Sequence, residues 1–444
     1  MRARIMLGLV CYFLICVSSQ AQIISTIAGN GTIGSTGDGG PASVAGLVNN
    51  NSVIVDGSGN IYITDGHTIR KISSSGIIST IAGTGIAGYN GDGIPATNAK
   101  LNSPMDIAID DSGNLYIADM HNQRVRKVDA GGFITTISGN GSMGYSGDGN
   151  QATDATFRDP THLILDKNGN LYIADSKNNV IRKIDTSGTI TTVAGEQYVI
   201  TLGTYCRYGG DNGPATAAYL CEPRDMLIDT SGCLYICDAG NHRVRKVNNS
   251  GIISTFAGNG LPGYPHDGNP ATASSISVPF GITAGMSGNV YILSTDGPVV
   301  RGINTGGLIY TYAGNGTSGY SGDGGPSLAA QLNNPAGIAM DMTGVMYIAD
   351  HDNYRVRKIS APTVVHEAGN KLSYAVFPNP ANNNVQFSGL NIVSIKLYNT
   401  FGRLLKETYY TDNIDVSDIP AGIYFFRLFN KNNELLHQSV FSKE

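Results

Sequence analysis

The stretch IISTIAGTG, at residues 77–85, decides the fold because it recurs five more times along the chain. Each copy joins a run of β-branched residues, which favours a strand, to a Gly-rich turn. Such self-similarity indicates a fold assembled from similar supersecondary units. The other copies are IISTIAGNG at 23, FITTISGNG at 133, TITTVAGEQ at 189, IISTFAGNG at 252 and LIYTYAGNG at 308, at spacings of 54, 56, 56, 63 and 56 residues.

Each unit then continues with a Gly-rich loop and three further strand-like runs. In the unit that begins at 77, these strands are expected at 105–110, 115–119 and 124–128, with a Ser-Gly-Asn turn between the first two. The next IIST-like run supplies a fourth strand. Four short strands joined by turns predict one antiparallel blade per unit.

The units resemble the NHL repeat family. The resemblance rests on LNSPMDIAIDDSGNLYIADMHNQRVRKV at 101–128 and LNNPAGIAMDMTGVMYIADHDNYRVRKI at 332–359, and it covers residues 23–360. It implies a β-propeller, and six units imply six blades over residues 22–360. Since the repeat part opens on an outer strand and ends on three inner ones, the first strand is expected to complete the last blade and close the ring.

The N-terminus has the pattern of a secretory signal peptide. Arg2 and Arg4 precede an apolar run over 5–17, and Ser19-Gln20-Ala21 is a small-x-small cleavage site. Residues 1–21 are therefore expected to be removed, and no other segment is apolar enough to cross a membrane. This predicts export to the periplasm and beyond.

The C-terminal residues 374–444 follow a linker-like stretch, 361–373, and resemble the sorting domain of type IX secretion substrates. The matching motifs are YAVFPNP at 374, LYNTFG at 397 and IPAGIY at 419. The resemblance implies a small β-sandwich, the type IX machinery as a partner, and a secreted or surface-anchored product. The complete prediction is an all-β chain with a propeller followed by a sandwich.

Composition and net charge limit the classes of partner that the chain is expected to bind. The net charge is −5 and only 14% of residues are charged, so nothing attracts a polyanion and nucleic acid is excluded as a partner. Four cysteines remain after the signal peptide, namely Cys206, Cys221, Cys233 and Cys237. Export favours disulfides, but the sequence leaves all three pairings open.

The Gly-rich loops contain a literal G-x-G-x-x-G in five units, beginning at Gly29, Gly83, Gly139, Gly258 and Gly314. No helix is expected after them, so the dinucleotide interpretation is rejected in favour of turn chemistry. Aspartates beside these glycines are expected to bond nearby backbone N–H groups, with calcium binding as the alternative. They are Asp38, Asp92, Asp148, Asp211, Asp267 and Asp323.

Aspartates that end the second strands are expected to pair with arginines of the third strands. They are Asp65, Asp119, Asp175, Asp238 and Asp350, and the fifth unit departs from the rule with Ser294 and Gly302.

One position lies two residues after the proline that opens each innermost strand, where the NHL pattern usually has Gly. It carries Asp106, His162 and Asp225 in three successive units, Gly281 and Gly337 in the last two, and Ser52 in the first, which lacks the proline. Asp/His/Asp at a channel mouth suits a divalent metal such as calcium or zinc, or a polar ligand. The alternative is three unrelated hydrophilic residues at a wet rim. No catalytic residue is assigned.

The long loops between units are the expected binding surface, because function usually lies on loops held by a rigid scaffold. Five of these loops carry a tyrosine at one equivalent position, and each ring is expected either to contact a glycan or peptide or to pack over its own loop. They are Tyr89, Tyr145, Tyr208, Tyr264 and Tyr320. The loop before the fourth blade is seven residues longer and holds Cys206 and Cys221 in or beside it. The sequence thus favours a non-enzymatic binder of a protein, peptide or glycan, with a metal-dependent lyase or hydrolase at the channel mouth as the alternative.

Overall fold

The computed structural model describes most of the repeat part (residues 22–360) and seven segments of the C-terminal part. The predicted signal peptide and the predicted linker lie outside the described residues. The chain divides into two compact units, residues 1–362 and 363–444. The described residues are 22–198, 206–264, 266–285, 288–360, 375–377, 384–388, 394–398, 404–409, 413–420, 422–429 and 435–443.

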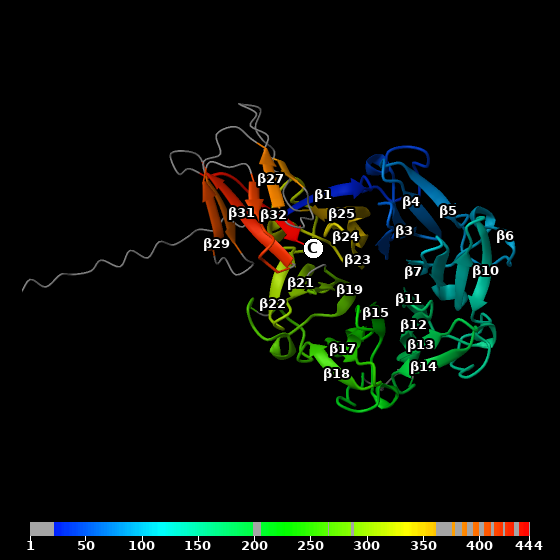
Figure 1. Ribbon diagram of the computed structural model, residues 1–444. Helices are drawn as coiled ribbons and strands as arrows, with labels where there is room; N and C mark the ends of the chain where they lie inside the picture. Colours follow the sequence, from blue (N-terminus) through cyan, green and yellow to red (C-terminus); the bar gives the residue numbers. More distant parts are fainter. Residues whose placement is uncertain are drawn as a thin grey trace, which may run out of the picture. The chain divides into compact units, whose positions relative to one another are not determined.

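The described repeat part is built from six antiparallel sheets of four strands, one of which gains a short fifth strand. Figure 1 shows these sheets grouped around a common centre. The strands of each sheet are given from the inside outward. The first sheet holds β2 (Val53–Val55), β3 (Ile61–Asp65), β4 (Thr68–Ile72) and β5 (Ile78–Ala82), and the second holds β7 (Pro104–Ile109), β8 (Leu115–Asp119), β9 (Arg124–Val128), β10 (Phe133–Ser138) and β6 (Ile94–Pro95). The third sheet holds β11 (Pro160–Leu165), β12 (Leu171–Asp175), β13 (Val180–Ile184) and β14 (Ile190–Ala194).

The last three sheets follow the same order. They hold β15 (Pro223–Ile228), β16 (Leu234–Asp238), β17 (Arg243–Val247) and β18 (Ile253–Ala257); β19 (Pro279–Ala284), β20 (Val290–Ser294), β21 (Val299–Ile303) and β22 (Ile309–Ala313); and β23 (Gly337–Met340), β24 (Met346–Asp350), β25 (Arg355–Ser360) and β1 (Ile23–Ala28).

The first strand of the described chain belongs to the last sheet. β1 pairs antiparallel with β25, from Ile23 opposite Ser360 to Ala28 opposite Val356. Each innermost strand contacts the innermost strand of the next sheet, and β23 contacts β2. The fold is therefore all-β, with four-stranded sheets arranged in a manner consistent with a β-propeller.

Local turn chemistry sets the hairpins between first and second strands. In the second sheet, Asp110 Oδ1 accepts hydrogen bonds from the N–H groups of Ser112 (3.0 Å) and Asn114 (2.9 Å). Gly113 lies between them at φ +80°, a conformation that favours glycine. An Asx turn of this kind reverses the chain without help from distant residues.

Each long loop does more than connect two sheets, because its middle covers the outer edge of the sheet that follows. In the second sheet this cover is β6, in which Ile94 and Pro95 lie opposite Ile134 and Phe133. Proline suits such an edge position, since it has no backbone N–H and the ladder does not require one there. The equivalent bridges join Pro41 to Ile77, Gln151 to Thr189, Pro214 to Ile252, Pro270 to Leu308 and Pro326 to Ile23. The loops thus protect edges that would otherwise pair with other chains.

Short 3-10 turns are the helical elements of the described chain, which accords with the expectation that no helix follows the Gly-rich motif. One set lies in the long loops: η1 (Ala42–Val44), η2 (Ala96–Asn98), η4 (Ala152–Asp154), η6 (Ala215–Ala217), η8 (Ala271–Ala273) and η9 (Ser327–Ala329). The other joins second and third strands: η3 (Met120–Asn122), η5 (Ser176–Asn178), η7 (Ala239–Asn241) and η10 (His351–Asn353).

The hydrophobic core lies between neighbouring sheets. One cluster unites Ile69 and Ala82 of the first sheet with Ile107 and Leu115 of the second, and all four are buried. Strand residues alternate between faces, so each sheet contributes to the core on either side of it. The periodic apolar pattern of every unit is needed for this arrangement.

The C-terminal unit contains two antiparallel sheets. One holds β26 (Ala375–Phe377), β27 (Asn384–Ser388) and β30 (Asn413–Asp415), and the other holds β29 (Leu404–Tyr409), β28 (Ser394–Tyr398), β31 (Gly422–Phe429) and β32 (Leu435–Lys443). Ile414 of the first sheet shares a buried cluster with Leu397 and Phe426 of the second. Two sheets over a common core agree with the small β-sandwich expected from the sequence.

Candidate functional site

A cavity of about 310 Å³ lies among the innermost strands of the six sheets. Asp106, His162 and Asp225, predicted to share a rim, all line it, and His162 contacts both aspartates. Each sits near the start of its innermost strand, where the chain enters from a long loop. The repeat therefore brings together three side chains that are far apart in the sequence.

His162 bridges the two aspartates. Its Nδ1 lies 3.1 Å from Asp106 Oδ2, and its Nε2 contacts Asp225 Oδ1. The imidazole is 22% exposed, whereas the carboxylates of Asp106 and Asp225 are 3% and 7% exposed. Both ring nitrogens thus contact carboxylates, so neither is free to bind a ligand in the cavity.

The carboxylates also reach neighbouring sheets. Asp106 accepts hydrogen bonds from Ser52 Oγ (2.6 Å) and from the N–H of Leu163 (2.8 Å), and Asp225 accepts one from the N–H of Ile282 (2.8 Å). The network runs from the first sheet to the fifth. Buried carboxylates satisfied in this way act as clamps between sheets.

Electrostatics favour a charged histidine. Burial alone would lower the pKa of His162, but the adjacent Asp106 and Asp225 raise that pKa to about 9. Burial and the nearby charge of Asp225 raise the pKa of Asp106, against the opposing effect of His162. A protonated imidazole between two carboxylates is a salt-bridge arrangement.

These residues do not fit a metal ion. A ligand histidine offers a ring nitrogen lone pair to the metal, but here both nitrogens face carboxylates. Among the described residues, no group of three or more His, Cys, Asp or Glu side chains has a metal-holding arrangement. The predicted calcium or zinc ion stays a prediction.

The last two sheets carry glycine at the equivalent position because the sheets approach closely there. A Cβ on Gly337 would lie 2.8 Å from Asn51 O, and one on Gly281 would lie 2.9 Å from Ile338 Cγ2. Contacts below 3.0 Å require movement of a neighbour. Close packing of neighbouring sheets replaces side-chain bridging on this side of the cavity.

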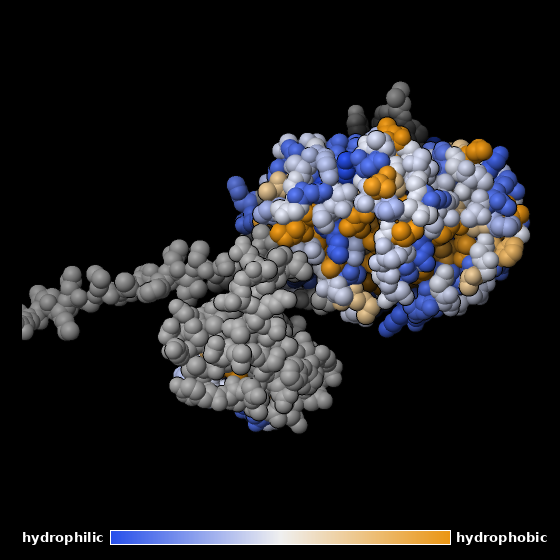
Figure 2. All heavy atoms as spheres, turned by 90° about the horizontal axis from the view of Figure 1, so that it is seen from above, coloured by the Kyte–Doolittle hydropathy of each residue, from blue (hydrophilic) through white to orange (hydrophobic). Residues whose placement is uncertain are grey.

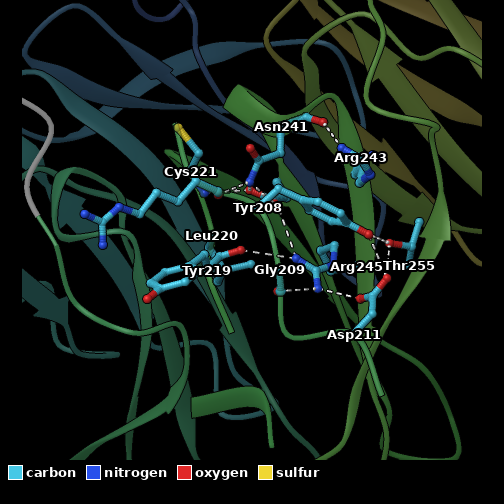
Figure 3. Close-up of polar contacts among 12 residues, drawn as sticks. Tyr208, Gly209, Asp211, Tyr219, Leu220, Cys221, Asn241, Arg243, Arg245 and Thr255 are labelled. Carbon is cyan, nitrogen blue, oxygen red and sulfur yellow. Dashed lines mark hydrogen bonds and ion pairs between the residues drawn. The ribbon is translucent and has the colours of Figure 1, made fainter. Parts of the chain in front are cut away.

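A buried arginine in each sheet anchors the long loop. In the fourth sheet, Arg245 pairs with Asp238 (3.4 Å), as predicted, and also with Asp211 of the long loop (2.5 Å). Figure 3 shows this guanidinium reaching Asp211, Gly209 O and Tyr219 O. Arg245 is fully buried, so burial without these partners would be costly.

The same pattern recurs around the repeat. The loop aspartates were expected to bond backbone N–H groups, as Asp38 does with that of Thr80 (3.0 Å), but the partner that all six share is the third-strand arginine, which the sequence did not predict. The other pairs to loop aspartates are Arg70–Asp38, Arg126–Asp92, Arg182–Asp148, Arg301–Asp267 and Arg357–Asp323. Pairs to second-strand aspartates are Arg70–Asp65, Arg126–Asp119, Arg182–Asp175 and Arg357–Asp350.

The repeated tyrosines contact their own loops. The hydroxyl of Tyr208 donates a hydrogen bond to Asp211 Oδ2 (2.8 Å), and the centre of its ring lies 3.7 Å from the guanidinium carbon of Arg243 (Figure 3). Three other tyrosines donate to the equivalent aspartate: Tyr89 to Asp92, Tyr145 to Asp148 and Tyr320 to Asp323. Tyr264 instead lies against Gly297, where a Cβ would overlap its hydroxyl. Ligand contact by these rings stays a prediction.

The fourth unit differs from the others in ways that sequence reasoning only partly identified. Cys206 and Cys221 form a disulfide, while Cys233 and Cys237 are buried free thiols. Arg207, which was not predicted, is exposed at this disulfide. The signal was present in the sequence, because Gly precedes the tyrosine in the four other units that have one and Arg precedes Tyr208.

Comparison with known proteins identifies the repeat. The sequence profile of the Teneurin NHL domain matches residues 27–90, 87–146, 141–206 and 202–263, which together cover more than half of the chain. The chain belongs to this NHL family. The profile of the secretion system C-terminal sorting domain matches residues 375–442.

Teneurin-1 from Homo sapiens is 28% identical over 381 residues, which cover 78% of this chain and 13% of that protein. Teneurin-4 from Mus musculus is 34% identical over 234 residues, covering 48% and 8% respectively. The chain thus spans only a small fraction of these relatives.

A crystal structure of an auxiliary nutrient binding protein from Bacteroides ovatus superposes with a TM-score of 0.55 at 19% identity, covering 78% of each chain. At this identity the likeness shows the fold alone. Together, the repeat and the sorting domain define an NHL-repeat scaffold that type IX secretion delivers to the cell surface or the medium. In the described part of the chain, no helix is long and apolar enough to span a membrane.

Proposed function

We propose that the chain is a non-enzymatic binding protein that holds a protein, peptide or glycan on its long-loop face. This face is the end of the repeat part where long loops meet the loops between second and third strands. One such meeting is the hydrogen bond from Asn122 Nδ2 to Gly88 O (2.6 Å). Rigid sheets with anchored loops suit recognition.

The network of His162 carries the proposal. Both carboxylates and both ring nitrogens are taken up by partners within the protein, so the cavity presents no free general base or nucleophile from this group. The same contacts explain the network as a connection between sheets. A binding role therefore accounts for the site without further chemistry.

Apolar side chains on the long loops support contact with a partner. Ile33, Ile86, Met143 and Leu261 are between 61% and 69% exposed. Figure 2 shows such apolar side chains exposed among polar ones on the repeat part. Screening the secreted protein on glycan, peptide and protein arrays tests the proposal, and a saturable ligand is expected.

The alternative is a metal-dependent lyase or hydrolase at the channel mouth. Metal analysis of the purified protein and of its Asp106→Ala and His162→Ala variants separates the two. The binding proposal expects no stoichiometric metal that depends on these residues. A bound metal lost in both variants, together with turnover of a ligand, would replace it.

We also propose that the six sheets are the blades of one closed propeller ring, with β1 as the closing strand, and that the C-terminal unit is a complete β-sandwich. The β1–β25 pairing and the chain of contacts between innermost strands support the ring. Closure would hold the long loops in a fixed relation, which a binding face requires.

A further inference from the structure

The fourth long loop carries a cluster of three side chains with no equivalent in the other units. We propose that Tyr198, Arg207 and Tyr219 form a binding site for the carboxylate of an acidic glycan, such as one containing uronic acid. The proposal deepens the binding function above and rests on it. We call these residues the Arg207 cluster.

Arg207 occupies a backbone position that is glycine in other units. Its carbonyl accepts a hydrogen bond from Asn241 Nδ2 (2.8 Å), as Gly88 O does from Asn122, Gly144 O from Asn178 and Gly319 O from Asn353. The backbone is therefore conserved among the units while the side chain is added. An arginine here is not needed for the fold.

The Arg207 side chain rests on two aromatic rings. Its guanidinium carbon lies 5.2 Å from the ring centre of Tyr198 and 5.4 Å from that of Tyr219. The rings meet edge to face at 6.1 Å. Cation–π contacts of this kind hold an exposed guanidinium in place and reduce the entropy lost on binding.

Hydrogen bonds and a disulfide hold the Arg207 cluster in place. Tyr198 Oη donates to Leu220 O (2.7 Å) and accepts from the N–H of Arg207 (3.0 Å). The disulfide joins Cys206, the neighbour of Arg207, to Cys221, two residues beyond Tyr219. Hydrogen bonds and a covalent link thus hold the three side chains together.

Charge points to an anionic ligand. Arg207 is exposed, and among the described residues its guanidinium pairs with no carboxylate, in contrast to the buried arginines of all six sheets. The undescribed loop residues 199–205 contain no Asp or Glu. A planar guanidinium binds a carboxylate through two parallel hydrogen bonds.

Backbone pairing favours a glycan over an acidic peptide. Peptides commonly dock through main-chain hydrogen bonds, but several of the backbone groups here are already used. Cys221 N–H donates to Asp238 (2.6 Å), Glu222 N–H donates to Asn179 (2.8 Å), and Tyr219 O accepts from Arg245 (3.3 Å). The side chains of the Arg207 cluster are a guanidinium and two aromatic rings, which suit a sugar ring bearing a carboxylate.

Calorimetric titration of the full chain with trigalacturonate, with neutral trigalactose and with triglutamate tests the proposal. Arg207→Gly gives the residue found at this position in the five other units, so it should fold, and thermal melting checks this. Trigalacturonate affinity should fall roughly tenfold to hundredfold in this variant. Arg207→Lys, which keeps the charge but loses the planar fork, should recover only part of the loss.

Lys167→Ala is the matched control, since it removes an exposed positive charge from the hairpin between β11 and β12. Its affinity should stay within about twofold of the parent, because a distant exposed charge contributes little. Equal binding of trigalactose, unchanged affinity in Arg207→Gly or preferential binding of triglutamate would overturn the proposal. Absence of trigalacturonate binding would also overturn it, while any array ligand independent of Arg207 would leave the binding function intact.

Discussion

Glycine is required in the Gly-x-Gly turns for two separate reasons. At the first glycine, a Cβ would strike the backbone of the preceding sheet, as at Gly83, where it would lie 2.3 Å from His67 O. At the second, the obstacle is a side chain. A Cβ on Gly141 would lie 2.2 Å from Nη1 of Arg124, whose guanidinium donates to Asn122 O and Asn140 O.

The second glycine accompanies this arginine in three units. Gly31, Gly141 and Gly260 face Arg355, Arg124 and Arg243. The third sheet has Val180 at the equivalent strand position, and the loop after it has Gln197 in place of glycine. Guanidinium packing therefore accounts for the second glycine in these three units, whereas Gly85 and Gly316 share only the positive φ (+79° in both).

Gly141→Ala should destabilise the protein more than Gly316→Ala. Both glycines have positive φ, so each substitution costs about 1–2 kcal/mol of backbone strain. Only Gly141 also displaces a guanidinium, because nothing lies within 4 Å of a Cβ on Gly316. Thermal or urea unfolding measures the difference, and adding Arg124→Thr should reduce the excess. Equal losses would contradict the packing explanation.

His162 should make stability depend on pH. Its pKa is raised in the folded protein to about 9, so its contribution is complete below the ordinary value of 6.5 and is lost as pH rises through 9. The melting temperature of the parent should fall more steeply between pH 7 and 10 than that of His162→Gln. Parallel curves would show that His162 is neutral in the folded state.

At the scale of elements, the sequence predicted the sheets well because their turns are local. An aspartate and a glycine fix the first hairpin in five of the sheets, while Gly285 takes the place of the aspartate in the fifth sheet, and the repeat fixes the number of units. The sequence also placed Asp106, His162 and Asp225 at one rim, since they occupy one repeated position. The bridging by both nitrogens of His162 escaped prediction because it depends on distances across the cavity.

The long loops were harder to predict than the strands. Their role as covers of outer edges, and the sharing of one arginine by two aspartates, arise only when the sheets pack. Arg207 escaped prediction for another reason: a repeat pattern indicates what the units share, and Arg207 is where one unit differs.

Deleting residues 22–28 should destabilise the last sheet, because β1 supplies its outermost strand. The melting temperature should fall, and amide exchange in β25 should rise as its hydrogen-bond partner is lost. Deletion of the same number of residues from the predicted linker, 363–369, is the control. An unchanged melting curve would contradict the closing role of β1.

At the scale of the whole molecule, the repeat part combines rigid sheets with loops that are anchored at both their middle and their ends. The acidic and basic groups inside it serve mainly to hold this scaffold. What distinguishes one unit from another is exposed: apolar tips on several loops and the Arg207 cluster on one. The C-terminal sorting domain places this scaffold outside the cell.

Hydrogen–deuterium exchange of the full chain, with and without a ligand found by array screening, tests the central claim most directly. Ligand should protect long-loop segments such as 30–36, 84–90 and 207–213, and leave the hairpins at 56–60 and 110–114 unchanged. Protection confined to those hairpins, or to the strands around the cavity of His162, would contradict binding through the long-loop face.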